Sequence, residues 1–427
     1  MNILFLIPSM ARTKTNGINP ARYLWRVILA PPVTFETLAA VTPPEHTIRL
    51  IDERTEKVNF NTDYDLVGIS TTTPASRRAY ELADEFRRRG ITVVLGGWHP
   101  SLFPQEAKQH ADTVVSGEGD EVWPQLLQDM KHGQLKPFYM SENMVDFPAL
   151  PVPKRTMQHR RGFFINELQV TRGCCNGCKY CSTTYRPYGQ ICRLRPIDKV
   201  IEEIESMRQK YLYFTDSSLT LNPAYTIQLF TALKNLNKKF ACNGNVNVLF
   251  RDKELIKLSL DAGCVEWAIG FESISQESLN LLGKQTNKID EFAPTVKKLH
   301  DFGLGVKGNF IFGADGDHPD IFNKTIDAIS DWELDIPAFS FLTPFPGTPL
   351  YQSLEAEKRI FSKDWSLYDL NHVVFQPKHM SPQELSDGMQ KVRDTMYSFS
   401  NNLKRAVRCF GSKHASFVAT GIQNFFI

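Results

Sequence analysis

The chain has 427 residues, 42% of them hydrophobic and 22% charged, and a formal net charge of +2 at pH 7. This length predicts two domains with an appendage, and the composition is typical of soluble globular proteins. The small net charge argues against nucleic-acid binding, and no apolar run has the length of a transmembrane segment. Residues 1–7 are too few and too uncharged for a signal peptide, so we expect a cytoplasmic protein.

Residues 1–130 alternate apolar runs of strand length with segments of helical periodicity. Strands are predicted at residues 3–7, 47–51, 66–70 and 91–95, and helices from residue 34 and over residues 77–89. This alternation predicts a doubly wound parallel sheet, in which ligands bind at the carboxyl ends of the strands. Those ends carry small hydroxyl residues, glycines and one acidic residue: Ser70, Thr71, Thr72, Gly96, Gly97, Gly117, Glu118 and Gly119. They leave room for a large flat ligand with amide-rich edges, or they serve only as tight turns.

Residues 131–164 have the composition of a connector between domains. Pro137, Pro151 and Pro153 interrupt any helix in this stretch. No periodic pattern is long enough to build a core. We therefore expect a linker here.

The most informative motif is C-x3-C-x2-C, formed by Cys174, Cys178 and Cys181. Three thiolates on one loop suit an iron–sulfur cluster, because the iron prefers soft sulfur ligands. A [4Fe-4S] cluster with three protein ligands keeps one iron open for another ligand. Structural zinc would usually need a second cysteine pair, and the cysteines beyond residue 181 are scattered.

Cys175 permits a second interpretation of the motif. With Cys178 and Cys181 it forms C-x2-C-x2-C, as in ferredoxins, but the C-P ending of that pattern is missing. A disulfide framework fits poorly in a chain of this size without a signal peptide. We interpret Cys175 as a bystander.

Residues 165–370 repeat the alternation of strands and helices with a longer period. Six strands are predicted at residues 167–171, 211–215, 240–245, 265–270, 307–312 and 338–342. Six such units predict a partial, open TIM-like barrel, whose chemistry lies at the carboxyl ends of the strands. The cysteine loop follows the first of these strands and therefore lies on that face. Residues 371–427 form a helical C-terminal extension with a basic, amphipathic end, which either packs back on the protein or touches an anionic membrane.

Three amides are predicted to share one face of the third barrel strand. Asn243, Asn245 and Asn247 alternate in the sequence, and side chains two apart on a strand point the same way. They indicate either a ligand surface or an exposed strand edge.

The cysteine spacing, with Tyr180 before the third cysteine, resembles the signature of the radical S-adenosylmethionine (radical SAM) superfamily. The resemblance implies that the amino and carboxylate groups of SAM chelate the open iron. It also implies that an electron from the cluster cleaves the sulfonium to a 5′-deoxyadenosyl radical. The reductant expected from the family is a flavodoxin or ferredoxin.

The resemblance also suggests which residues bind SAM. Asp216 follows the second barrel strand where the family typically shows two acidic residues, and Ser217 replaces the second. Asp216 could instead cap the following helix. Gly270 and Glu272 are similar to a G-x-E stretch of the family, and Gly313 to a glycine beside the adenine. The SAM-binding residues expected are Tyr180, Asp216, Ser217, Gly270, Glu272 and Gly313.

The phrases at residues 94–100 and 115–119 resemble the cobalamin-binding domain that precedes the cluster domain in one radical SAM class. This resemblance implies cobalamin at the strand ends of residues 1–130. The D-x-H-x-x-G motif that supplies a cobalt-ligating histidine is absent after the first strand, and we do not assign His99 to that role. The function implied is cobalamin-dependent C-methylation of a small molecule. The alternatives are another radical SAM reaction on the same scaffold without cobalamin, and a non-catalytic iron–sulfur protein.

Overall fold

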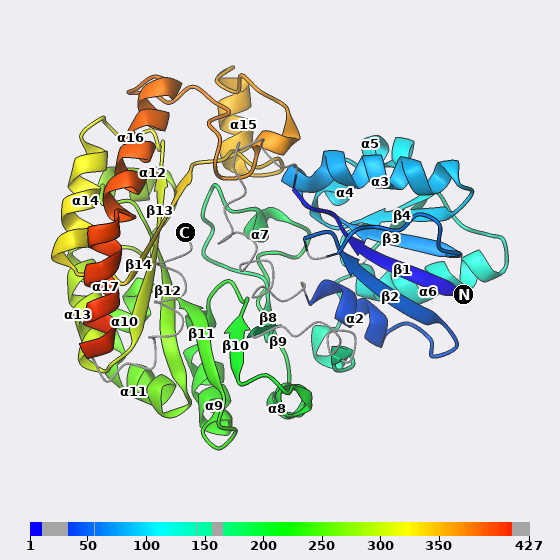
Figure 1. The fold of residues 1–427 in the computed structure, drawn as a ribbon, viewed down its shortest axis with the longest axis horizontal. Helices are drawn as coiled ribbons and strands as arrows, with labels where there is room; N and C mark the ends of the chain where they lie inside the picture. Colours follow the sequence, from blue (N-terminus) through cyan, green and yellow to red (C-terminus); the bar gives the residue numbers. More distant parts are fainter. Residues whose placement is uncertain (11–32, 55, 142, 156–164, 412–427) are drawn as a thin grey trace.

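The computed structural model describes residues 1–10, 33–54, 56–141, 143–155 and 165–411. Two α/β domains lie side by side, each built on a parallel six-stranded sheet (Figure 1). The short helix α7 (Ser182–Tyr185) lies between them in this view. The predicted fold class, a doubly wound domain followed by a partial barrel and C-terminal helices, is confirmed.

The first sheet has the strand order β2-β1-β3-β4-β5-β6, with every pair parallel. Its strands are β1 (Asn2–Ile7), β2 (Thr47–Asp52), β3 (Leu66–Ser70), β4 (Thr92–Gly96), β5 (Thr113–Ser116) and β6 (Phe138–Met140). The strands form because their residues are apolar and mostly buried on both faces, as parallel sheets require. Strand β6 lies within the predicted linker, so the sheet continues past residue 130.

Helices cover both faces of this sheet. One hydrophobic core packs α3 (Ser76–Arg88) and α5 (Pro104–His110) against the sheet. A second core packs α2 (Thr34–Ala40) and α6 (Gly119–Lys131) against it. In α3 the predicted apolar positions Ala79, Leu82, Ala83 and Phe86 are all fully buried. The helical spacing of these side chains therefore correctly predicted which face of α3 packs on the sheet. The short helix α4 (Trp98–Leu102) follows β4.

The second sheet has the order β14-β13-β12-β11-β10-β7, with all pairs parallel. Its strands are β7 (Ile165–Leu168), β10 (Tyr211–Phe214), β11 (Lys239–Gly244), β12 (Cys264–Glu272), β13 (Gly305–Phe312) and β14 (Ile336–Phe341). Because β7 and β14 are its edges, the sheet is an open half-barrel. A two-stranded antiparallel ribbon, β8 (Thr171–Arg172) and β9 (Arg193–Leu194), brackets the cysteine loop.

Helices on the outer side of the half-barrel follow its strands in order. They are α8 (Ile197–Ser206), α9 (Pro223–Leu233), α10 (Val246–Arg251), α11 (Lys253–Asp261), α12 (Gln276–Leu281), α13 (Phe292–Asp301) and α14 (Ile321–Asp331). Beyond β14 come α15 (Pro349–Ala356), α16 (Pro382–Met396) and α17 (Phe399–Gly411). Helix α17 packs back on the protein, with Arg405 and Ala406 buried. None of the described helices is long and apolar enough to cross a membrane.

The prediction of an amide row on one strand is wrong. Strand β11 ends at Gly244, Asn245 is the residue before helix α10, and Asn247 lies inside that helix. The backbone N–H of Asn245 donates to Thr220 Oγ1 at 2.8 Å, at the point where the chain turns into the helix. Only Asn243 stays on the strand, where its amide nitrogen donates to the Asp216 carbonyl at 2.7 Å.

Several contacts join the domains, and two of them lie away from the strand ends. Arg155 is buried and pairs with Glu36 of α2 and with Glu203 of α8, so it bridges the two domains. On the opposite side, Trp365 packs against His99 and Phe103 of the first domain, at ring-centroid distances of 5.7 and 5.1 Å. His99 is fully buried and contacts Glu106 at 3.1 Å, which is a structural role.

Candidate cofactor and cluster site

The three predicted iron ligands share one loop between β8 and α7. Cys174 and Cys178 are buried and Cys181 is partly buried, whereas Cys175 is exposed. Burial raises the pKa of the Cys174 and Cys178 thiols, so both are held neutral until a metal replaces the proton. In the described part of the chain, no three His, Cys, Asp or Glu side chains converge closely enough to share one metal ion. A cluster does not require such convergence, since each thiolate binds a different iron.

Backbone contacts from three other segments hold this loop. The Cys174 amide donates to the Gly189 carbonyl at 2.7 Å, and the Lys179 amide donates to the Leu282 carbonyl at 3.0 Å. The Lys179 carbonyl accepts from Leu350 at 3.1 Å. Gly173 has φ 94°, and a Cβ there would collide with the carbonyl of the passing chain. The loop is therefore pinned by its backbone, which leaves the thiols free for ligation.

Beside Cys178 lies a buried charged group formed by Glu272, Lys284 and Tyr180. Lys284 Nζ and Glu272 Oε1 are 2.9 Å apart, and burial together with the Glu272 carboxylate raises the pKa of Tyr180. Burial alone would lower the pKa of Lys284, but the Glu272 carboxylate and the Cys178 thiol raise it above its ordinary value. A Cβ at Gly270 would overlap the Glu272 carboxylate. The structure thus brings together Tyr180, Gly270 and Glu272, three of the predicted SAM residues.

One carboxylate oxygen of Asp216 accepts three hydrogen bonds. Its Oδ1 accepts hydrogen bonds from the amides of Val170 and Thr171 and from the Thr171 hydroxyl. Burial raises the pKa of Asp216 to about 6, although these hydrogen bonds oppose the rise. Its Oδ2 is buried without a partner among the described residues. Asp216 therefore holds the chain segment that leads into the cysteine loop.

Two further predicted SAM residues lie apart from the charged group. Ser217 is exposed beside Asp216. Gly313 has φ 107° and donates its amide to Asp317 at 2.9 Å. A Cβ at Gly313 would lie 2.9 Å from Leu385 of α16. Close packing on the C-terminal helix already requires glycine at this position.

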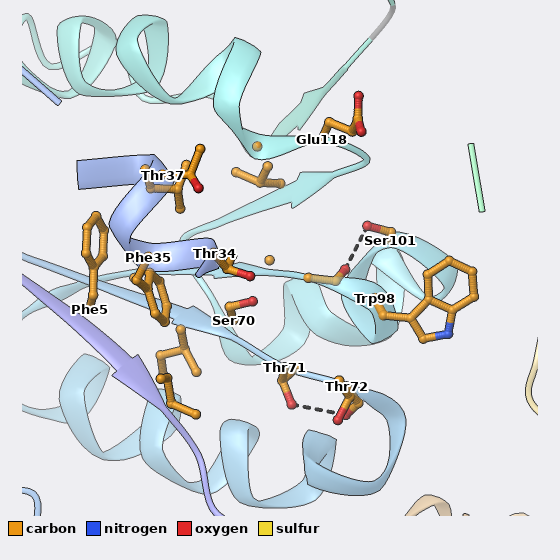
Figure 2. A pocket seen from close by; sticks show the side chains of 18 of the residues that line it. Phe5, Thr34, Phe35, Thr37, Ser70, Thr71, Thr72, Trp98, Ser101 and Glu118 are labelled. Carbon is orange, nitrogen blue, oxygen red and sulfur yellow. Dashed lines mark hydrogen bonds between the residues drawn. The ribbon is translucent and has the colours of Figure 1, made fainter. Parts of the chain in front are cut away.

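A cavity of about 530 Å³ opens at the carboxyl ends of the first sheet, a size typical of cofactor sites. All the residues predicted there line it: Ser70, Thr71, Thr72, Gly96, Gly97, Gly117, Glu118 and Gly119. Figure 2 shows the hydroxyl side chains of Ser70, Thr71 and Thr72 on the strand end, and Trp98 at the far side. The inner part is apolar, with Phe5, Phe35 and Trp123 on its wall.

The residues of this cavity fit cobalamin. At Gly97, φ is 97° and a Cβ would lie 2.7 Å from the Thr71 carbonyl oxygen, so only glycine lets these two strand ends pack together at the cavity wall. Trp98 lines the cavity, and its indole N–H is buried without a partner in the described chain. A free donor at this place suits a ligand whose edge carries amide oxygens. The apolar inner part suits an aromatic group.

Several lining residues were not expected from the sequence. Thr34, Thr37 and Leu38 come from α2, which lies over the strand ends in Figure 2. Gln169, Arg172 and Arg186 come from the cluster domain. The pattern of residues 34–38 does not indicate a ligand site, because it is that of an ordinary amphipathic helix. The nearness of Arg172 to the cysteines in sequence was the one available hint.

Glu118 lines the cavity, and its carboxylate is held by the cluster domain. Arg193 binds it in a bidentate manner, at 2.6 and 2.7 Å. Arg172 lies 3.6 Å from Glu118 and also pairs with Asp120. Burial raises the pKa of Glu118, but the arginines outweigh it and the net pKa is lowered. This ion-pair group therefore joins the strand end of the first domain to the ribbon beside the cysteine loop.

Comparison with known proteins identifies both domains. Residues 168–329 match the Radical SAM superfamily, and residues 42–127 match the B12 binding domain. The chain is 30% identical to bacteriochlorophyllide d C-12(1)-methyltransferase of Chlorobaculum tepidum over 88% of this chain and 84% of that protein. It is 32% identical to bacteriochlorophyllide d C-8(2)-methyltransferase of the same organism, over 87% of this chain and 86% of that protein.

A solved structure confirms the arrangement of the fold. The radical SAM methyltransferase TsrM from Kitasatospora setae, with cobalamin and a [4Fe-4S] cluster bound, superposes with a TM-score of 0.64 at 17% identity. The match covers 83% of this chain and 78% of that one. The cofactors of the 427-residue chain described here are a [4Fe-4S] cluster, SAM and cobalamin. The chain belongs to the cobalamin-dependent radical SAM methyltransferases.

Proposed function

We propose that this enzyme methylates a carbon at the periphery of a chlorophyllide-type tetrapyrrole. The observation that carries the proposal is its similarity to two bacteriochlorophyllide d methyltransferases over most of their length. A third relative, the anaerobic magnesium-protoporphyrin IX monomethyl ester cyclase of Cereibacter sphaeroides, also acts on a tetrapyrrole. It is 26% identical over 76% of this chain and 58% of that protein.

The cavity supports a reaction between the two domains. Its wall combines strand ends of the cobalamin domain with Gln169, Arg172 and Arg186 of the cluster domain. A substrate there would contact both halves of the enzyme. When bound, SAM and the cluster supply a radical that removes hydrogen, and cobalamin supplies the methyl group.

The residues of the chain bind and orient. We assign Cys174, Cys178 and Cys181 as the iron ligands, and the pinned backbone of their loop supports that assignment. We assign Glu272 to polar groups of SAM, because Lys284 holds the carboxylate beside Cys178. We also assign Asp216 to SAM, because its Oδ2 is buried without a partner among the described residues while Oδ1 holds the segment before the cysteine loop.

The cobalamin and reductant assignments complete the proposal. The strand-end residues from Ser70 to Thr72 and the glycines at 96, 97, 117 and 119 bind cobalamin. Glu118 contributes by joining the domains, as its bond to Arg193 indicates. A flavodoxin or ferredoxin is the proposed electron donor, since the cluster needs one electron in each cycle.

The test is an anaerobic reconstitution with iron, sulfide and hydroxocobalamin, followed by assays with bacteriochlorophyllide d, SAM and a reductant. We expect four irons and one corrin per chain, and a methylated pigment formed together with S-adenosylhomocysteine and 5′-deoxyadenosine. The Cys178→Ala variant is the control and should yield none of the three. If 5′-deoxyadenosine forms without S-adenosylhomocysteine, the reaction is not a methylation. If neither forms with this pigment, the tetrapyrrole assignment is wrong.

A further inference from the structure

The guanidinium group of Arg186, which forms no ion pair with a residue that the structure describes, lies on the cluster side of the cavity. Arg186 directly follows helix α7, which itself begins after Cys181. The Arg186 carbonyl accepts from the Gly189 amide at 2.8 Å, and the Gly189 carbonyl accepts from Cys174 at 2.7 Å. A Cβ at Gly189 would meet the Arg186 side chain at 2.9 Å. The turn therefore fixes Arg186 to the cysteine loop while its side chain lines the cavity.

The neighbouring carboxylates are paired with other arginines and compensate Arg186 only in part. Arg172 and Arg193 use the two nearby carboxylates, Glu118 and Asp120. Two carboxylates thus face three guanidinium groups, and Arg186 makes no side-chain hydrogen bond or ion pair with a described residue. Burial lowers the pKa of Arg186, the nearby Glu118 carboxylate opposes this, and Arg172 and Arg193 lower it further, so that the net pKa is lowered. The side chain still stays charged, so this part of the cavity wall, with three guanidinium groups and two carboxylates, carries a net positive charge.

We propose that Arg186 binds an oxyanion of the molecule that occupies the cavity, and that this oxyanion is a carboxylate of the methyl acceptor. A planar guanidinium binds a carboxylate in a bidentate manner and orients it, which a point charge does not. The inference deepens the proposed function and rests on it, because a chlorophyllide carries a free propionate carboxylate. The phosphodiester of cobalamin offers the same chemistry in the same cavity, and the experiment separates the two sources.

The experiment uses the reconstituted holoenzyme, three variants and two matched pairs of ligands. The variants are Arg186→Gln, Arg186→Lys and the control Arg208→Gln, whose arginine is exposed and does not line the cavity. Bacteriochlorophyllide d is compared with its methyl ester, which lacks the carboxylate charge. Cobalamin is compared with cobinamide, which lacks the phosphodiester. Binding is measured by absorbance titration, and iron content is measured for each variant.

The expected result is specific for charge. Arg186→Gln should raise the Kd of the free acid about ten- to a hundredfold and leave the Kd of the ester unchanged. Arg186→Lys should restore part of the affinity, and Arg208→Gln should change nothing. A loss confined to cobalamin, with cobinamide unaffected, would keep the oxyanion role and transfer it to the phosphodiester.

Two results would overturn the inference. One is that Arg186→Gln binds both members of each pair as the wild type does. The other is that only iron content falls, which would make Arg186 a partner of the cluster and its thiolates. If the wild type binds neither the acid nor the ester, the tetrapyrrole proposal fails by itself. The cobalamin pair then decides the role of Arg186 alone.

Discussion

The two halves of this enzyme prepare their cofactor sites in opposite ways. At the strand ends of the first domain, glycines and short hydroxyl side chains enclose a cavity of about 530 Å³. At the cysteine loop, buried charged side chains gather instead, with Glu272 paired to Lys284 and close to Tyr180. Small side chains and glycines thus dominate the strand ends of the first site, whereas ionised groups and thiols dominate the second.

This difference predicts what each half tolerates. A site made by absent side chains is damaged by adding atoms, because strained glycine positions and close backbones leave no room. A site made by ionised groups is damaged by removing one of them, because its partner is left buried and uncompensated. The predictions below test this contrast, in order of decreasing effect.

Removing a thiol of the cluster loop should have the largest effect. Cys174→Ala, Cys178→Ala and Cys181→Ala should each abolish cluster assembly and SAM cleavage, because we assign each thiolate as the protein ligand of one iron. Iron and sulfide analysis with detection of 5′-deoxyadenosine measures this loss. Cys192→Ala is the control and should keep both. Full iron content in any of the first three variants would refute the ligand assignment.

Breaking the bridge between the halves should cost about 3–5 kcal/mol of unfolding free energy. Arg155→Met leaves the buried carboxylates Glu36 and Glu203 without their shared guanidinium. Urea denaturation of the apoprotein measures the change. The control Arg49→Met removes a solvent-exposed pair with Glu56 and should cost about 1 kcal/mol or less. Equal losses of unfolding free energy in the two variants would show that the buried bridge stabilises the protein no more than a surface ion pair does.

Adding one methyl group to the strand-end cavity should weaken cobalamin binding. In Gly97→Ala, the positive φ costs about 1–3 kcal/mol, and the new Cβ must also move the Thr71 backbone. We expect a Kd for hydroxocobalamin at least about tenfold higher, measured by absorbance titration. Gly90→Ala is the matched control, because φ is 78° but no atom lies within 4 Å of the added Cβ. Gly90→Ala should lose stability but not cobalamin affinity.

Neutralising Glu272 should weaken SAM binding by about tenfold, since a hydrogen bond to a charged group contributes about 1.5–3 kcal/mol. Calorimetric titration of SAM into the Glu272→Gln holoenzyme measures this. Glu277→Gln changes an exposed carboxylate on the following helix and should have no effect. An unchanged SAM affinity in Glu272→Gln would assign the residue a purely structural role.

The smallest effect concerns the pH dependence of stability. The pKa of Asp216 is about 6 in the folded protein, above its ordinary value of 3.8. The folded state therefore holds a proton that the unfolded chain releases, and this stabilisation is present below about pH 4 and lost as the pH rises to 6. Asp216→Asn should flatten that decline by about 1 kcal/mol per pH unit in urea denaturation. The exposed Asp327→Asn should leave the curve unchanged.

Much of the fold could be predicted from local patterns. The spacing of Ala79, Leu82, Ala83 and Phe86 identified the buried face of α3 because packing repeats with the helical period. The row from Asn243 to Asn247 failed for the opposite reason. The bond from the Asn245 amide to Thr220 Oγ1 comes from a distant segment and starts a helix where alternation indicated a strand.

The sequence by itself determined the chemical groups of the site: three thiols in one loop, and glycines with short hydroxyl side chains at successive strand ends. The spacing of the cysteines along the chain and the alternation of strands and helices are sufficient to identify these groups, since both patterns are local in the sequence. Only the tertiary structure decided that Glu118 joins the domains through Arg193, that Lys284 meets Glu272, and that Arg186 lines the cavity without an ion pair to a described residue. Each of these depends on which segments, remote in the chain, pack together, and pairing of buried charges has no period that a sequence could display.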